Sequence, residues 1–214
     1  MNNRNFPIAL DGFVFIIPLA LLAGVFAYLG AGGMSMFFLA AAFFVLWFFR
    51  NPNRTTPEDE KAIISPADGR VIKIEEVEAQ EMLQGGARKV SIFMNIFNVH
   101  VNRAPCAGTV KEIVYRKGRF FSANLDKASA FNERNLVLIE TMGGDRILTI
   151  QIAGIIARRI VCWVKEGMGI EKGERFGLIK FGSRLEVLMP LDATIPVKVG
   201  DKVRAGETRI GYLI

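Results

Sequence analysis

The sequence predicts a mostly β, barrel-sandwich-like domain that follows an N-terminal helical hairpin. Residues 12–49 contain no charged side chain, so the start of the chain is set apart by its apolarity. After residue 61 the chain divides into short runs of alternating apolar residues punctuated by glycine, which is typical of β-strands, and helical periodicity is scarce there. Many short strands in one domain favour a closed or sandwiched barrel, because such a fold avoids open edges.

The apolar region divides into two helical runs, Phe13–Leu29 and Met34–Phe49, around the glycine-rich turn 30–33. Each run is a little shorter than the roughly 20 residues that cross a bilayer core as a straight helix. A transmembrane hairpin is the preferred interpretation, and a re-entrant hairpin fits nearly as well. A secretory signal peptide with cleavage near Ala31 is the alternative. It would still leave a second apolar run behind, so it is disfavoured.

Basic residues flank the hairpin on both sides. Arg4 precedes it, Arg50 and Arg54 follow it, and the turn carries no charge. The positive-inside rule therefore predicts that both ends, and the domain that follows, lie on the cytoplasmic side of the cell (inner) membrane. The two cysteines, Cys106 and Cys162, have no disulfide-framework spacing, which agrees with a reducing compartment.

The charge balance also favours a membrane surface as the partner. The chain holds 27 basic and 21 acidic residues, for a formal charge of +6. Residues 1–50 contribute two basic residues and one acidic residue, so +5 lies on the remainder. A basic domain tethered to a membrane suits an anionic phospholipid surface. Nucleic acid is set aside as a partner, because no basic run with interleaved aromatic residues is present.

We divide the chain into a membrane hairpin (1–50), a polar linker (51–61) and a β-rich domain (62–214). Residues 125–132 are predicted to be helical, and 155–164 could be helix or strand. The tail 196–208 has the glycine spacing of hairpins in biotinyl- and lipoyl-carrier domains, but no lysine at a hairpin tip is evident, so it supports the fold and not a carrier function. The predicted strands are Ala67–Ile74, Lys89–Ile96, Gly108–Tyr115, Leu136–Thr141, Ile147–Ile152, Phe176–Lys180, Leu185–Met189, Ile195–Val197 and Arg209–Leu213.

Three residues could carry chemistry, and each also has an ordinary structural interpretation. His100 is the only histidine and lies near a strand end. Asp68 precedes a glycine in a turn-like sequence, and Ser183 follows Gly182 between two apolar runs, as in a hairpin turn or bulge. The Ser183 segment is not the G-x-S-x-G elbow of hydrolases, because Leu185 stands where the second glycine belongs.

The chain closely resembles the short form of the phosphatidylserine decarboxylase family, including its archaetidylserine-acting relatives. The resemblance runs from about Phe48 to the C-terminus. Asn51 stands where relatives often carry Asp, a linker change that puts nothing catalytic in doubt. Six sequence landmarks support the resemblance: Phe48-Phe-Arg-Asn-Pro-Asn-Arg54, Ser65-Pro-Ala-Asp-Gly69, Asn98-Val-His-Val-Asn-Arg103, Ala123-Asn-Leu-Asp-Lys-Ala-Ser129 with Asn132-Glu-Arg-Asn135, Gln151-Ile-Ala-Gly154 with Ala157-Arg-Arg-Ile160, and Phe181-Gly-Ser-Arg-Leu-Glu186.

The resemblance implies an autocatalytic proenzyme of phospholipid biosynthesis. Gly182-Ser183 would be the self-cleavage site, with Asp68, His100 and Ser183 as the processing triad. Cleavage would give a large subunit (1–182) and a small subunit (183–214) whose first residue becomes a covalent pyruvoyl cofactor. We expect the two to stay together because the strands on either side of the cut belong to one sheet. The resemblance implies no metal.

The implied reaction decarboxylates the serine headgroup of phosphatidylserine to give phosphatidylethanolamine and CO2. The residue types suit this chemistry: a serine hydroxyl needs a base, an Asp-oriented His supplies one, and glycine leaves the attacked carbonyl uncrowded. The pyruvoyl carbonyl would form a Schiff base with the substrate amine and accept the electrons released with CO2. His100 is also a candidate proton donor.

Arginine is the natural partner for the lipid phosphate, because guanidinium matches phosphate oxygens in a forked geometry. Arg103, Arg158 and Arg159 are the candidates, although each could equally be a solvated surface charge. Residues 124–129 are interpreted as a helix start, with a substrate-facing loop as the alternative. Archaetidylserine as substrate, a non-enzymatic membrane adaptor with a carrier-like barrel, and a homo-oligomer all stay open.

Overall fold

The structure is a computed structural model that describes residues 6–78, 82–83, 85–123, 131–155, 159–180 and 182–214. It divides into two compact units, Met1–Asn53 and Arg54–Ile214. The boundary between the units falls inside the polar segment 51–61.

The first unit is a pair of apolar helices, α1 (Phe13–Tyr28) and α2 (Gly32–Phe48), preceded by the short 3-10 helix η1 (Leu10–Gly12). The helices pack through stacked rings of Phe26 and Phe38 and through a hydrogen bond from Ser35 Oγ to the Ala23 carbonyl (2.9 Å). These bounds confirm the two predicted helical runs.

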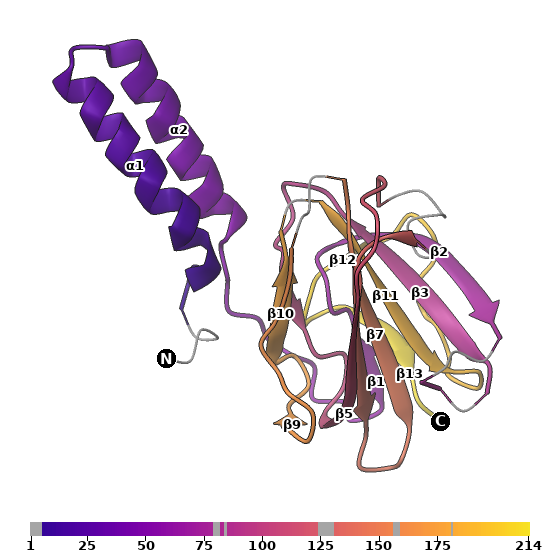
Figure 1. The fold of residues 1–214 in the computed structure, drawn as a ribbon. Coiled ribbons are helices and arrows are strands. Elements are labelled where there is room, and N and C mark those ends of the chain that lie inside the picture. Colours follow the sequence, from indigo (N-terminus) through magenta and orange to yellow (C-terminus); the bar gives the residue numbers. More distant parts are fainter. Residues whose placement is uncertain (1–5, 79–81, 84, 124–130, 156–158, 181) are drawn as a thin grey trace. The chain divides into compact units, whose positions relative to one another are not determined.

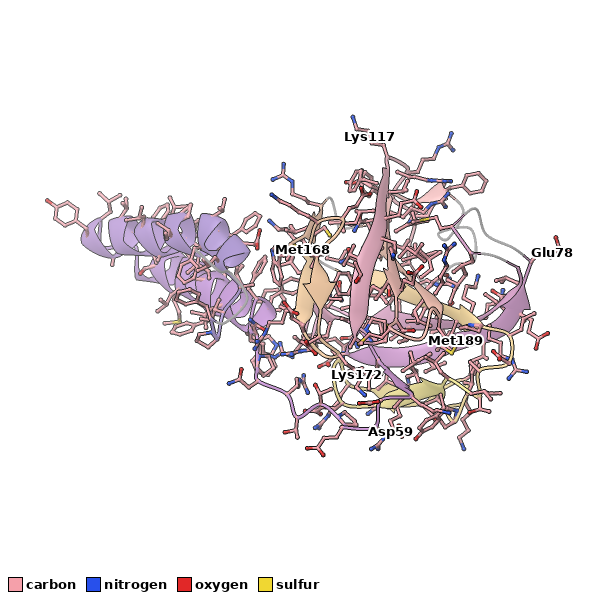
Figure 2. All side chains as sticks on the ribbon, turned by 90° about the horizontal axis from the view of Figure 1, so that it is seen from below. Asp59, Glu78, Lys117, Met168, Lys172 and Met189 are labelled. Carbon is pink, nitrogen blue, oxygen red and sulfur yellow. The ribbon has the colours of Figure 1, made fainter. Side chains whose placement is uncertain are left out.

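The outward faces of both helices are as apolar as their shared interface. Figure 2 shows their side chains as almost wholly carbon, whereas nitrogen and oxygen atoms crowd the β-rich unit. One helical stretch, Leu10–Tyr28, has 19 residues and a mean hydropathy of 2.2, enough by length and composition to cross a membrane; the second, Gly32–Phe48, is shorter. A helix that is apolar all round is found in a large core or in a bilayer. The first unit therefore favours membrane association. Its exposed apolar side chains include Val14, Leu21, Val25, Met36, Phe37 and Phe43.

Over its described residues, the regular structure of the second unit is almost entirely β-strand, which confirms the predicted fold class. Its eight-stranded antiparallel sheet has the order β12-β2-β3-β11-β7-β6-β5-β9, and Figure 1 shows its long strands lying side by side. A three-stranded sheet, β4-β10-β8, and the pair β1-β13 complete the unit. The strands are β1 (Ala62–Ile64), β2 (Gly69–Val77), β3 (Ala87–Met94), β4 (Val101–Arg103), β5 (Gly108–Arg116), β6 (Arg134–Glu140), β7 (Arg146–Ala153), β8 (Ile160–Cys162), β9 (Gly169–Ile170), β10 (Arg175–Ile179), β11 (Ser183–Pro190), β12 (Lys202–Val203) and β13 (Arg209–Tyr212).

The central strand β11 is covered on both faces. Leu185, Val187 and Met189 point into the main apolar core, while Leu188 packs on the opposite face in a second cluster that includes Leu148. Successive side chains of a strand point to opposite faces, so the two clusters alternate along β11. The strand that begins at Ser183 is thus fixed from both sides.

Eight of the nine predicted strands are present, with ends shifted by at most three residues. The exception is Ile195–Val197, which forms no strand; its neighbour Thr194 makes an isolated bridge to Tyr212. The ambiguous segment 155–164 contains strand β8. The predicted helix 125–132 lies mostly outside the described residues.

Two predictions about strand pairing were wrong. The strands before and after Gly182-Ser183 do not share a sheet, because β10 pairs with β4 and β8 whereas β11 pairs with β3 and β7. The C-terminal tail is not a hairpin either: β12 pairs with β2, and β13 pairs with β1. Strands β11, β12 and β13 find their neighbours far away in the sequence, where local spacing gives no information.

The polar segment 51–61, which contains the boundary of the two units, has no regular element over residues 51–59. Asp59 lies near the end of this segment, and its carbonyl accepts a hydrogen bond from the Lys172 ammonium. Figure 2 shows these two residues at the same edge of the β-rich unit. The start of β1 is therefore tied to the loop that follows β9.

Candidate active site

The Gly182-Ser183 pair lies at the start of β11, where three strands meet. Ser183 is paired with Met94 of β3 on one side and with Ala153 of β7 on the other. Its side chain is fully buried, and its hydroxyl lies 3.3 Å from the Met94 sulfur. In the uncut chain the hydroxyl is therefore directed into the domain.

Gly182 is held by both of its backbone polar groups. Its N–H donates to His100 Nε2 (3.3 Å), and its carbonyl accepts from the Gly154 N–H (3.1 Å). Its φ of +69° lies in the left-handed region, which glycine adopts without a steric penalty. The peptide that precedes Ser183 is thus fixed in a conformation that other residues rarely adopt.

His100 is 2% exposed, and its ring contacts define one neutral tautomer. Nε2 accepts from the Gly182 N–H, so it carries a lone pair; Nδ1 then carries the proton and donates to the Asn98 carbonyl (3.0 Å). That carbonyl belongs to a tight turn in which Asn98 Oδ1 accepts from the Asn95 N–H (2.9 Å). The base-competent nitrogen therefore faces the residue before Ser183.

Asp68 makes different contacts from those expected of an orienting carboxylate. Oδ2 pairs with Arg54 Nη2 (2.9 Å), and Oδ1 accepts from the Ala205 N–H (2.8 Å). The cause is local: β12 pairs with β2 at the residue that follows Asp68, and this brings the tail loop against the carboxylate. The structure therefore brings His100 to the Gly182-Ser183 pair but engages both Asp68 oxygens elsewhere.

Arg103 lies in the same charged cluster as Asp68. It is 6% exposed, and its Nη1 donates to the Gly173 carbonyl (2.8 Å). Burial, with the nearby guanidinium groups of Arg175 and Arg54, lowers the pKa of Arg103 to about 10. It stays charged at neutral pH. Of the other two candidate phosphate partners, Arg159 is exposed and Arg158 lies outside the described residues.

A ladder of buried amides leads to the Ser183 hydroxyl on the inner face of the sheet. Asn135 Nδ2 donates to Gln151 Oε1 (2.9 Å), and Gln151 Nε2 donates to Asn102 Oδ1 (2.8 Å). Asn102 Nδ2 then lies 3.9 Å from the Met94 sulfur, which is the Ser183 partner. Buried polar groups are costly without partners, so this network fixes the inner wall of the site.

On the other face of β11 the residue after Ser183 is a buried cation. Arg184 Nε lies 2.9 Å from Glu186 Oε1, and Arg184 Nη2 donates to Ser91 Oγ of β3 (2.9 Å). Lys89 lies 4.0 Å from the second Glu186 oxygen. The hydrogen bond to Ser91 ties the beginning of β11 to its neighbouring strand.

Sequence reasoning missed the groups that hold the site through the backbone. The Asn98 carbonyl and the Gly154 N–H have no side-chain signature, and Met94 looks like an ordinary core residue. Gly154 did stand in a landmark, Gln151-Ile-Ala-Gly154, but nothing in that pattern gave it a role.

Comparison with known proteins places the chain in a class of enzyme precursors, since the curated relatives that it matches are named as proenzymes. It is 57% identical over 213 residues to the phosphatidylserine decarboxylase proenzyme of Syntrophus aciditrophicus, covering 99% of both chains. The corresponding proteins of Desulfotalea psychrophila and Geobacter metallireducens are 48% and 47% identical over the full length of both chains. A model of the family described as phosphatidylserine decarboxylase matches residues 41–211. The chain belongs to the phosphatidylserine decarboxylase family.

Proposed function

We propose that this chain cuts itself between Gly182 and Ser183 and then decarboxylates phosphatidylserine to phosphatidylethanolamine, with a pyruvoyl group made from Ser183. Family membership supports the reaction. The observation that supports this cleavage site is the pair of hydrogen bonds made by Gly182. Its N–H donates to the only histidine of the chain, and its carbonyl accepts from the Gly154 N–H.

The first step of maturation is an acyl shift. The Ser183 hydroxyl leaves Met94 by rotation about χ1 and attacks the Gly182 carbonyl carbon, while His100 Nε2 takes the hydroxyl proton. Collapse of the tetrahedral species breaks the peptide C–N bond, and the proton passes to the Ser183 nitrogen. The amide is thereby exchanged for an ester.

Elimination completes the cut. Loss of the Ser183 α-proton breaks the Cβ–Oγ bond and leaves Gly182 as a carboxylate. Addition of water to residue 183 and loss of ammonia then give the pyruvoyl group. That group supplies a carbonyl that binds the substrate amine and accepts the electrons released with CO2.

The contacts at the beginning of β11 suit a residue that must stay in place after the cut. β11 pairs with β3 over eight residue pairs and with β7 over six, and both neighbours belong to the proposed large subunit. The Arg184–Ser91 hydrogen bond adds a side-chain tie beside the new N-terminus. These pairings, together with β1-β13 and β2-β12, would hold the two subunits together without a covalent link.

Roles for the other candidate residues follow from the site. We assign His100 as the base in maturation and as the proton donor in decarboxylation, since its Nε2 faces the reacting residue. Asp68 belongs to the proposed triad by family resemblance. To orient His100, the Asp68 carboxylate would have to give up its contact with Arg54 or with the Ala205 N–H and accept a hydrogen bond from His100 Nδ1 instead. Arg159, which is exposed, is better placed than the buried Arg103 to meet a lipid phosphate.

Purified chain incubated with vesicles of phosphatidylserine tests the function. We expect release of CO2 and formation of phosphatidylethanolamine by the cut protein. Parallel vesicles of archaetidylserine decide between the two lipid classes; we expect phosphatidylserine to be the better substrate, as the names of the relatives indicate. An intact 23.7 kDa chain without activity would contradict the proposal and favour a membrane adaptor.

We further propose that the β-rich unit faces the cytoplasm of a cell whose inner membrane holds the hairpin. The basic flanks Arg50 and Arg54, against an uncharged turn, support this orientation. Protease added outside spheroplasts should leave the β-rich unit intact, and the same protease should digest it after detergent permeabilisation. Digestion without detergent would overturn this topology.

A further inference from the structure

We infer that the backbone N–H of Gly154 is the oxyanion donor for self-cleavage, and that Asn132 positions it. This inference rests on the proposed cut at Gly182-Ser183 and adds a group to its chemistry. Attack by the Ser183 hydroxyl moves the carbonyl electron pair onto the Gly182 oxygen, so negative charge develops on that atom. A donor already aimed at the oxygen stabilises the charge without reorganisation.

The Gly154 N–H is such a donor. It lies just after the end of β7, is buried, and binds the Gly182 oxygen at 3.1 Å. The distance is measured to the carbonyl oxygen before attack, and it is already close to the roughly 2.7–3.1 Å that separates an oxyanion donor from the charged oxygen. The same hydrogen bond continues the β7–β11 ladder by one step beyond the pair Ser183 and Ala153. The regular geometry of the sheet therefore directs the Gly154 N–H at the Gly182 oxygen.

Only glycine allows this approach at position 154. A Cβ built there would lie 2.2 Å from the Gly182 oxygen and 3.1 Å from its carbonyl carbon. Real Cβ atoms do not come so close to a backbone oxygen, so any side chain would push the scissile carbonyl away. The close contact falls on the one carbonyl of the chain that the proposed chemistry attacks.

Asn132 fixes the peptide group that carries the donor. Its Nδ2 donates to the Ala153 carbonyl (2.7 Å), which belongs to the same peptide unit as the Gly154 N–H. The side chain is 2% exposed and is itself held by Phe121, whose N–H it accepts (2.9 Å) and whose carbonyl it binds (2.8 Å). Donation to the carbonyl of a peptide polarises its N–H, because linked hydrogen bonds strengthen one another. Asn132 is thus a positioning residue for the oxyanion donor.

Gly154→Ala tests the donor, with Gly108→Ala as the matched control. A Cβ at Gly108 would also lie 2.2 Å from a backbone oxygen, that of Glu140, at the β5–β6 ladder. Loss of one oxyanion donor slows reactions by about 10²–10³-fold, and we expect that slowing of cleavage in Gly154→Ala. The control should cut at the parent rate. Equal slowing in both variants, or parent-like cutting in Gly154→Ala, would overturn the inference.

Asn132→Ala provides a second test that leaves Gly154 itself unchanged. We expect it to slow the acyl shift at least tenfold, so that uncut chain accumulates as amide. Hydroxylamine, which cleaves esters and not amides, should leave that uncut chain whole, whereas a block after the acyl shift would make it sensitive. Hydroxylamine-sensitive uncut chain, or cutting at the parent rate, would refute the role of Asn132. This assay decides the question even if Gly154→Ala does not fold.

Failure of the inference can be told from failure of the proposed function. If the parent chain does not cut at all, the proposed function falls. If the parent cuts and Ser183→Ala does not, while both Gly154→Ala and Asn132→Ala cut like the parent, only the inference falls.

Discussion

Ser183→Ala is expected to yield one uncut chain of 23.7 kDa with no decarboxylase activity. A methyl group can neither attack the Gly182 carbonyl nor become a ketone, so both maturation and the cofactor are lost. The fold should persist, because the Ser183 hydroxyl contacts the weakly accepting Met94 sulfur and is replaced by a smaller group. Intact-mass measurement after purification decides the outcome: the parent should give two masses, for residues 1–182 and 183–214.

Ser183→Cys is the informative companion of this variant. A thiol can make the same acyl shift, so we expect slow and incomplete cutting. If Ser183→Ala instead gave two fragments, the mechanism would be refuted, because alanine at position 183 has no group that could initiate the cut.

The sequence carried enough information for the fold class and for both helices. The charge-free run 12–49 and its glycine-rich interruption predicted α1 and α2 almost to the residue. Alternation of apolar and polar residues located eight strands, because this period is set by the strand itself. These features are local, and local features are what a single sequence displays.

Strand partners could not be predicted in the same way. β10 and β11 are separated by only a few residues, yet they belong to different sheets, and the tail strands pair with β1 and β2 near the start of the unit. Such pairings depend on which surfaces the whole chain buries. Proximity in sequence suggested the wrong neighbours for both.

The candidate site shows the same division between side chains and backbone. Ser183 and His100 stood out by residue type and resemblance, and the structure brings His100 to the peptide before Ser183. The groups that orient this arrangement are the Asn98 carbonyl and the Gly154 N–H. The first has no residue-type signal, and the second has only the glycine itself, whose role the sequence does not state. Their placement is a property of the fold, so it could not be predicted from a motif.

His100→Ala is expected to block cleavage severely while leaving the fold intact. The imidazole lone pair accepts from the Gly182 N–H, and its loss removes the proposed base. His100 is buried, so circular dichroism and thermal melting should accompany a time course of band splitting. Cutting at the parent rate would make the histidine a bystander in maturation.

Asp68→Asn asks which group orients that histidine. If Asp68 takes over Nδ1 during the reaction, as the proposed triad requires, cutting should slow by about 10⁴-fold, the loss seen when the orienting carboxylate is removed from the analogous hydrolase triad. If the Asn98 carbonyl orients the ring throughout, the tautomer survives and cutting continues. We expect the large loss, because the resemblance of this chain to its family implies that Asp68 is a member of the triad.

Arg54→Gln separates orientation from simple anchoring. It removes the ion pair of Asp68 and the weaker pair with Glu207 (3.5 Å), but leaves the Asp68 carboxylate in place. An orienting Asp68 predicts slow cutting in Asp68→Asn and nearly normal cutting in Arg54→Gln, since release from Arg54 leaves that oxygen available for His100. Equal slowing in the two variants would instead assign Asp68 to anchoring through its ion pair with Arg54, which both variants lose. Parent-like cutting in Asp68→Asn would leave the Asn98 carbonyl as the orienting group.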